Sequence, residues 1–190
     1  MVSRRSFVLF LCVAAAALSA TSEKAPRPSP DFAIGVNDGT QLHLSQYRGE
    51  VVVLAFILTS CPHCQFTVGV LSRLQTEYGP RGLQVVASAI DPMSSMLVPD
   101  FIKNFQPTFP VGFNEHSQAI EYLEHPVIYR LMMPQLVFID RQGVIRAQYS
   151  GDDPFFNKTD QEKNIREAIE PLLKEKPAAE VRKTASKKKT

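Results

Sequence analysis

The chain has few cysteines, three in 190 residues, and this number excludes a small scaffold held together by disulfides. It has no second CxxC pair, so the four-ligand set of a structural zinc site is incomplete. It also lacks an apolar run long enough to span a bilayer, because the run at residues 7–18 has only 12 residues. What is present is a hydrophobic fraction of 44%, enough to build the core of one domain without a metal or a disulfide.

Residues 1–20 have the order of a secretory signal peptide. Arg4 and Arg5 come first, the apolar run at 7–18 follows, and small residues end the segment. A short buried helix is the alternative, which the N-terminal position and the order of charges disfavour. The letters SRRSF around the two arginines resemble the start of a twin-arginine signal. We therefore expect a periplasmic or otherwise exported protein that loses Cys12 together with its signal peptide.

Two further segments are expected to lie outside the folded domain. Residues 21–30 contain three prolines and no apolar periodicity, which is typical of an extended linker. From Lys174 to Thr190, seven Lys or Arg and two Glu give +5, so the rest of a chain of net charge +2 carries −3. Such an end can bind anionic lipid or nucleic acid, but a disordered Lys-rich tail at 176–190 is the simpler interpretation, with no nucleic-acid partner. The folded domain is expected at 31–175.

Strand patterns alternate with helix patterns inside this domain. VVVLAFIL (51–58) is a continuous apolar run, typical of a central strand buried on both faces. A β-hairpin is predicted within 32–50, and Asp91 is placed to cap the helix that follows the second strand. This order predicts an α/β fold with a mostly parallel sheet covered by helices on both faces, to which a closing hairpin adds antiparallel strands. The main strands are predicted at 51–58, 83–90, 109–113, 135–140 and 144–150, and the helices at 66–79, 93–105, 117–124 and 160–175.

Cys61 and Cys64 follow the buried strand and open a helix. Unpaired N–H groups and the helix dipole at such a position stabilise an anion, and cysteines there have pKa values of about 3.5–7.5. Pro62 suits the first helical turn because its missing N–H would have no partner there. A protonated His63 would favour the thiolate further. The pattern predicts that Cys61 attacks and that the more buried Cys64 resolves.

Other interpretations of the pair stay open at this point. Structural zinc lacks ligands, whereas Cu(I) bound by the two thiolates and a distant histidine is an alternative from another functional class. An inert buried pair is the third interpretation. Beyond the motif, a carboxylate near the cysteines could accept the proton of Cys64, although a solvated helix face is the simpler explanation of the charged cluster. That cluster comprises Glu115, His116, Glu121, Glu124 and His125.

The segments 31–64 and 133–151 together resemble the thioredoxin superfamily, and within it the exported TlpA/ResA-like thiol-disulfide oxidoreductases with an AhpC/TSA-like redoxin domain. The first holds a hairpin, a strand and CPHC, and the second holds MPQLVFIDRQGVIRAQYSG. The resemblance implies a thioredoxin fold, with a central mixed sheet flanked by helices and an N-terminal β-hairpin extension. It also implies that Pro134 is cis, packs against the cysteines and holds the backbone of Met133 open to a substrate chain.

Two departures limit what the resemblance implies. The dipeptide Pro62-His63 resembles the oxidising DsbA-type motif, not the Glu-Pro of the ResA-like reductants, so the direction of electron flow stays open. The Sco copper chaperones share the lead-in TSCP but use CxxxC. Peroxidase chemistry is disfavoured, because peroxiredoxins have threonine and proline where this chain has Leu58 and Leu54.

The sequence thus predicts a monomeric thiol-disulfide oxidoreductase that needs no cofactor or metal. Its implied partners are the thiols and disulfides of exported proteins, in cytochrome c maturation or oxidative folding. A membrane electron donor or acceptor is a further partner that this role allows.

The signal-peptide prediction can be tested by fusing residues 1–25 to a reporter. We expect export that is lost in a strain without the twin-arginine machinery, because SRRSF resembles that class of signal. Unchanged export in the deficient strain would contradict the twin-arginine assignment and leave the general secretory route.

Overall fold

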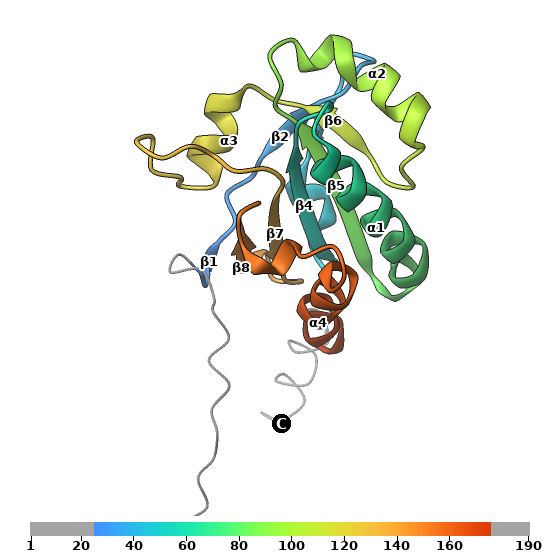
Figure 1. Cartoon of the computed structure of the whole chain (residues 1–190). Helices are drawn as coiled ribbons and strands as arrows, with labels where there is room; N and C mark the ends of the chain where they lie inside the picture. The colour runs from blue at the N-terminus through green and yellow to red at the C-terminus, as the bar shows by residue number, and fades with distance from the viewer. Residues whose placement is uncertain (1–24, 176–190) are drawn as a thin grey trace, which may run out of the picture.

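The structure is a computed structural model of the chain and describes residues 25–175 (Figure 1). The predicted signal peptide at 1–20 and the predicted tail at 176–190 lie outside the described residues. Within them, eight strands form one sheet in the order β1-β8-β7-β4-β5-β6-β2-β3. The strands are β1 (Arg27–Pro28), β2 (Ala33–Gly35), β3 (Gln41–His43), β4 (Val51–Ile57), β5 (Leu83–Ala89), β6 (Val111–Phe113), β7 (Gln135–Ile139) and β8 (Val144–Tyr149). The helices are α1 (Pro62–Tyr78), α2 (Ser94–Phe105), α3 (His116–Tyr122) and α4 (Gln161–Lys174), with short 3-10 turns at Leu44–Tyr47, Gly79–Arg81 and Pro154–Phe156.

Strand β4 is the centre of the core, and all seven of its residues are buried. Alternate side chains enter two different cores: Val53 and Ala55 pack on the side of α1, α2 and α4, while Leu54 packs on the side of α3 and the N-terminal hairpin. Figure 1 shows α1 and α4 on one side of the sheet and α3 on the other. Burial on both faces explains why the strand reads as an unbroken apolar run.

The sheet is mixed, as the predicted fold class requires, but it is not mostly parallel. Only β4, β5 and β6 run parallel, and the other pairings are antiparallel. The prediction was wrong on this point because α3 and the segment after it do not return the chain to the start of the sheet. Strand β7 instead begins where β4 ends, with Gln135 opposite Phe56. The residues just before β7 therefore lie at the same end of the sheet as the end of β4.

The predicted linker is part of the fold from Arg27 onward. Arg27 and Pro28 form β1 and pair with β8, and the N–H of Ser29 donates to the oxygen of Gly143 at 2.9 Å. Proline is tolerated here because β1 is an edge strand, where an absent N–H leaves no bond unmade in the sheet interior. The Arg27 guanidinium also donates to the oxygen of Tyr122 at 2.9 Å. These long-range contacts, not local periodicity, make the segment a strand.

Candidate active site

The two cysteines lie at the start of α1, directly after the end of β4. Cys61 is the N-cap residue, with extended backbone, and Pro62 occupies the first turn. The N–H of Cys64 donates to the Cys61 sulfur at 3.4 Å, so this sulfur occupies the position of a capping acceptor. The N–H of Cys61 itself donates to the oxygen of Leu58 at 3.1 Å, which closes the turn between strand and helix.

The two sulfurs differ in their exposure. Both thiols are free, but Cys61 is half-buried while Cys64 is fully buried in the core beneath α1. Burial raises the pKa of the Cys64 thiol; the hydrogen bond with Cys61 and the negative charge of Asp91 raise it further, whereas the Leu58 backbone lowers it. One sulfur is therefore partly open to solvent, and the other is buried and held as a thiol.

Pro62 and His63 are both exposed at the rim of the site. The His63 oxygen accepts from the Thr67 hydroxyl at 2.9 Å, which is an intrahelical contact. The effect of the His63 ring on the Cys61 sulfur stays a prediction from the sequence.

Met133 and Pro134 lie directly before β7, at the end of the sheet where β4 also ends. The Met133–Pro134 peptide bond is cis, as predicted, and Pro134 is buried while Met133 is half-buried. Met133 and Cys61 pack against the same core. The segment is anchored by Gln135, whose side-chain nitrogen donates to the oxygen of Met132 at 2.6 Å and to the Ser150 hydroxyl at 2.9 Å.

Gly151 is a residue of this site that the sequence analysis did not identify. Its N–H donates to the oxygen of Met132 at 3.2 Å. A methyl group added at Gly151 would lie 2.3 Å from the Met133 oxygen, closer than any side chain can approach. The glycine thus permits the turn after β8 to pack directly on the backbone of Met133. In the sequence it appears only as part of a polar turn, which carries no sign of this contact.

Asp91 was predicted to cap α2, and this prediction was wrong. Helix α2 begins after Met93, which has left-handed backbone geometry, and no side chain caps it. The Asp91 carboxylate instead accepts from the N–H of Thr59 at 2.9 Å and from the Thr59 hydroxyl at 3.1 Å. Asp91 follows β5, the parallel neighbour of β4, so the ends of two adjacent strands bring it to the turn that carries Cys61.

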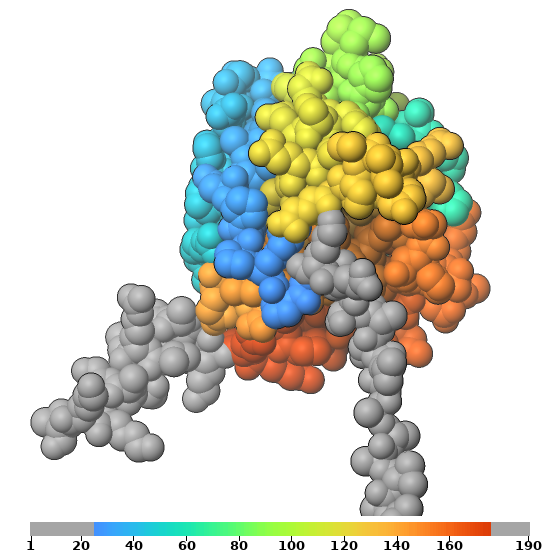
Figure 2. Space-filling view, turned by 90° about the vertical axis from the view of Figure 1, so that its left-hand side faces the viewer, coloured from blue at the N-terminus to red at the C-terminus, as the bar shows by residue number. Residues whose placement is uncertain are grey.

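The predicted charged cluster lies mainly along a groove of about 940 Å³. His116, Glu121, Glu124 and His125 line the groove, and further lining residues include Leu58, Val127, Tyr129, Arg130 and Leu131. Figure 2 shows α3 and the following segment, in yellow to gold, on this face of the molecule. The carboxylate that acts on the Cys64 thiol is that of Asp91, which does not belong to the predicted cluster.

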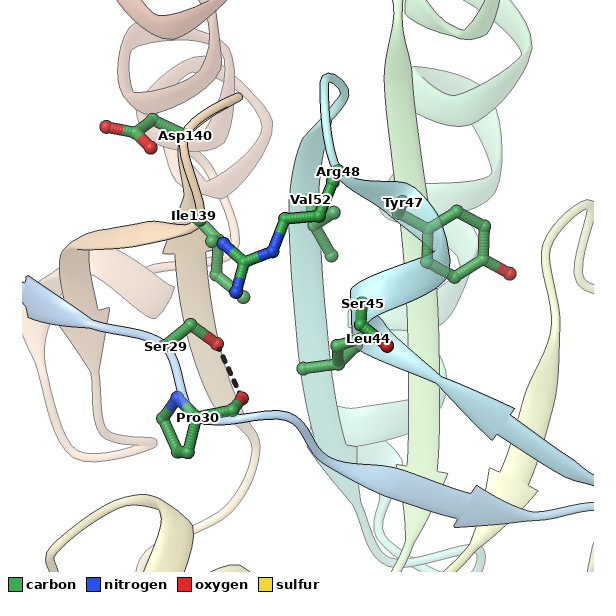
Figure 3. A pocket seen from close by; sticks show the side chains of 10 residues that line it. Ser29, Pro30, Leu44, Ser45, Tyr47, Arg48, Val52, Ile139 and Asp140 are labelled. Atoms are coloured by element: carbon green, nitrogen blue, oxygen red, sulfur yellow. Dashed lines mark hydrogen bonds between the residues drawn. The ribbon is translucent and has the colours of Figure 1, made fainter. Parts of the chain in front are cut away.

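A second cavity, of about 10 Å³, lies at the other end of β4 (Figure 3). It is lined by residues that include Val52, Arg48 and Asp140, and no cysteine borders it.

In the part of the chain from 25 to 175, no three His, Cys, Asp or Glu side chains gather in a way that could hold a metal ion. None of the helices in the same range is long and apolar enough to cross a membrane.

Comparison with known proteins identifies the class and then the family. The chain is similar to a Chlorobium tepidum protein assigned as thiol:disulfide interchange protein DsbE, with a TM-score of 0.63, 28% identity and coverage of 76% of this chain and 96% of that one. A second similar structure is a Chlorobium tepidum protein of the thioredoxin family, with a TM-score of 0.62 and 20% identity. The alignment covers 78% of this chain and 99% of that protein's chain. The predicted thioredoxin fold is thus confirmed.

Curated relatives and a family model agree with this class. The thiol-disulfide oxidoreductase ResA of Geobacillus kaustophilus is 28% identical over 145 residues, which cover 75% of this chain and 76% of the relative. ResA of Oceanobacillus iheyensis is 26% identical over 160 residues, covering 77% and 80%. The model of the AhpC/TSA family matches residues 26–148. The chain belongs to the AhpC/TSA family.

The burial of Cys64 generates a prediction about stability and pH. An unfolded chain loses the Cys64 proton near its ordinary pKa of about 8.5, whereas the folded, reduced protein keeps it because burial raises that pKa. Cys64 should therefore leave the free energy of unfolding unchanged below about pH 8 and lower it above, by up to about 1.4 kcal/mol per pH unit. Urea titrations of the reduced protein between pH 7 and 10 measure this.

The control for this titration is Cys64→Ala, which retains Cys61 and removes the buried thiol. The difference in free energy of unfolding between the two proteins should be constant below pH 8 and then fall. A difference that stays flat to pH 10 contradicts the raised pKa.

The close approach of Gly151 to Met133 generates a second prediction. Gly151→Ala should displace the Met133–Pro134 segment and destabilise the protein by about 1–3 kcal/mol, as overpacking does. Gly69→Ala on α1 is the matched control: nothing lies within 4 Å of its added methyl group, so it should be neutral or stabilise by about 0.5–1 kcal/mol. Urea unfolding measures both, and equal stability of the two variants would contradict the packing described for Gly151.

Proposed function

We propose that this protein is a thiol-disulfide oxidoreductase whose redox couple is Cys61 and Cys64. The observation that carries the proposal is the pairing of a half-exposed sulfur with a fully buried one, three residues apart at the start of a helix. The fold and the names of the relatives support it, since both the ResA and the DsbE proteins have names that refer to thiol-disulfide chemistry.

The exchange follows from the difference between the sulfurs. The Cys61 thiolate attacks one sulfur of a substrate disulfide, the substrate S–S bond breaks, and the departing sulfur takes up a proton. Cys64 then gives up its proton and attacks the Cys61 sulfur, which breaks the mixed disulfide and releases the second substrate thiol. The substrate gains two electrons and two protons, and the protein is left with a Cys61–Cys64 disulfide. An oxidised protein runs the same steps in reverse with a substrate dithiol.

The neighbours of the cysteines have proposed roles in this exchange. Pro62 starts the helix with Cys61 at its N-cap, and a protonated His63 adds positive charge at the exposed rim. Pro134 lies buried at the end of β4 where it can cover the couple, and Met133 offers backbone to an incoming substrate chain. Gly151 supports this arrangement, because it lets β8 hold the backbone of Met133 at close range.

The setting of the reaction is proposed from the sequence. Residues 1–20 have the order of a signal peptide, so exported proteins are the proposed substrates, in cytochrome c maturation or in oxidative folding. Cytochrome c maturation needs a reducing couple, which a membrane donor supplies with electrons. Oxidative folding needs an oxidising couple, which a membrane acceptor reoxidises. We propose that the protein acts as a monomer.

The proposal predicts different defects for the two cysteines. Cys61→Ser should lower the rate of insulin reduction by at least about 100-fold, because it removes the attacking sulfur. Cys64→Ser should accumulate a mixed disulfide with the substrate through Cys61, because it removes the resolving sulfur. Turnover with dithiothreitol as the donor, and intact mass of the acid-quenched reaction, measure the two effects.

Ser60→Ala, next to the motif on an exposed residue, is the matched control and should retain normal turnover. The copper-binding alternative is tested on the same proteins by anaerobic titration with Cu(I). Tight binding that depends on both cysteines, in a protein without any reductase activity, would replace the redox proposal with a Sco-like assembly function.

A further inference from the structure

A line of hydrogen bonds runs from the start of α4 to the sulfur of Cys61. The side-chain nitrogen of Gln161, the first residue of α4, donates to the Thr67 hydroxyl at 2.7 Å. That hydroxyl donates to the backbone oxygen of His63 at 2.9 Å. The peptide group that carries this oxygen also carries the N–H of Cys64, which donates to the Cys61 sulfur at 3.4 Å. Three hydrogen bonds thus connect α4 in series with the sulfur that is proposed to attack.

Every donor along this line points toward Cys61. A hydroxyl has one hydrogen and two lone pairs, so Thr67 can accept from the Gln161 amide and donate to the His63 oxygen at the same time. Thr67 and Gln161 are each only 1% exposed, so water does not compete for these bonds. The line therefore has one direction, from the interior between α1 and α4 to the sulfur at the start of α1.

Hydrogen bonds that share one direction strengthen the last bond of the line. In the low dielectric of a protein interior such bonds polarise one another, and donation to a peptide oxygen makes the N–H of the same peptide group a stronger donor. A hydrogen bond donated to the charged form of a group favours that form. The N–H of Cys64 therefore stabilises a thiolate at Cys61 more strongly because Thr67 donates to the oxygen of the same peptide group.

We propose that Thr67 and Gln161 are positioning residues of the redox site: through the peptide group between His63 and Cys64 they strengthen the hydrogen bond to the Cys61 sulfur and stabilise its thiolate. This inference rests on the proposed function. Because thiolates exist only in the reduced couple, the same line of bonds favours the dithiol over the disulfide and makes the protein a stronger oxidant.

The line acts on Cys61 without a charge of its own, since neither Thr67 nor Gln161 has a titratable group. The charged or titratable side chains of the elements around the motif are those of His63 and Cys64 on α1, Asp91 after β5, Asp152 and Asp153 after β8, and Lys158 and Asp160 before α4. The variants below alter none of these side chains. A shift in the pH profile of Cys61 therefore reports the hydrogen bonds.

The test is the rate at which iodoacetamide alkylates Cys61 in the reduced, folded protein between pH 4 and 9, read by peptide mapping. Thr67→Val removes the hydroxyl with little change of volume and should move the midpoint of this profile up by about 0.5–1 pH unit. The rate below the midpoint then falls roughly three- to tenfold. Above the midpoint the rate should stay within about twofold, because the exposure of the sulfur is unchanged. Gln161→Leu should move the midpoint in the same direction by less.

Two further variants separate the hydrogen bond from packing. Thr67→Ser keeps a hydroxyl and should keep the wild-type midpoint. Thr76→Val is the matched control on the same helix: the Thr76 hydroxyl is exposed and donates to the oxygen of Ser72 at 3.0 Å, further along α1 from the cysteines. It is the same kind of contact as that between Thr67 and His63, and its loss should not move the midpoint.

The outcomes distinguish this inference from the proposed function. If the wild-type cysteines form no disulfide at any ratio of reduced to oxidised glutathione, the proposed function fails. If they form one and Thr67→Val has the wild-type midpoint, the inference is overturned, even where the rate falls at every pH. A shift in Thr67→Val with none in Gln161→Leu overturns the role of Gln161. If Thr67→Val does not fold, Gln161→Leu decides in its place: an upward shift supports the inference and an unchanged midpoint overturns it.

Discussion

The site depends on one constraint, the short passage from the buried strand β4 into α1, where the N–H of Cys64 donates to the sulfur of Cys61. The chain leaves a strand that is buried over its whole length and enters a helix within four residues. Because β4 packs on both faces, its end has little freedom to move, and this end fixes the position at which α1 begins. The sulfur that caps the helix therefore occupies a fixed place at the surface, while the sulfur three residues on is forced into the core.

The same end of the sheet receives the other elements of the site. Strand β7 runs antiparallel to β4 and begins where β4 stops, which puts Met133 and Pro134 at the same end of the sheet as the cysteines. The turn after β8 packs on this segment through Gly151, and Asp91, which follows β5, bonds to Thr59 in the turn before Cys61. Residues next to the ends of three strands thus lie at the end of the sheet that carries the turn. The wide groove along α3 is lined in part by Leu58, three residues before Cys61.

Local patterns in the sequence were sufficient for the central parts of this arrangement. The unbroken apolar run predicted β4, the position of CPHC after this strand predicted the start of a helix, and the segment from 135 to 150 predicted a closing hairpin. The resemblance to a known family, not a local pattern, implied the cis bond before Pro134. The rest depends on contacts between residues far apart in the chain. Asp91 looks like a helix cap because caps are local, yet its partner Thr59 is 32 residues away. Gly151 looks like a turn residue because nothing nearby reveals the backbone it approaches, and Arg27 and Pro28 look like a linker because β8 lies more than a hundred residues later.

The central claim is that the two sulfurs divide the work, one presented to partners and one withheld. Brief alkylation of the reduced, folded protein with iodoacetamide at neutral pH, followed by peptide mapping, tests it most directly. The account predicts that Cys61 is labelled at least about tenfold faster than Cys64, because only the first is accessible and Cys64 is held as a buried thiol. Equal labelling of the two cysteines, or faster labelling of Cys64, would contradict it.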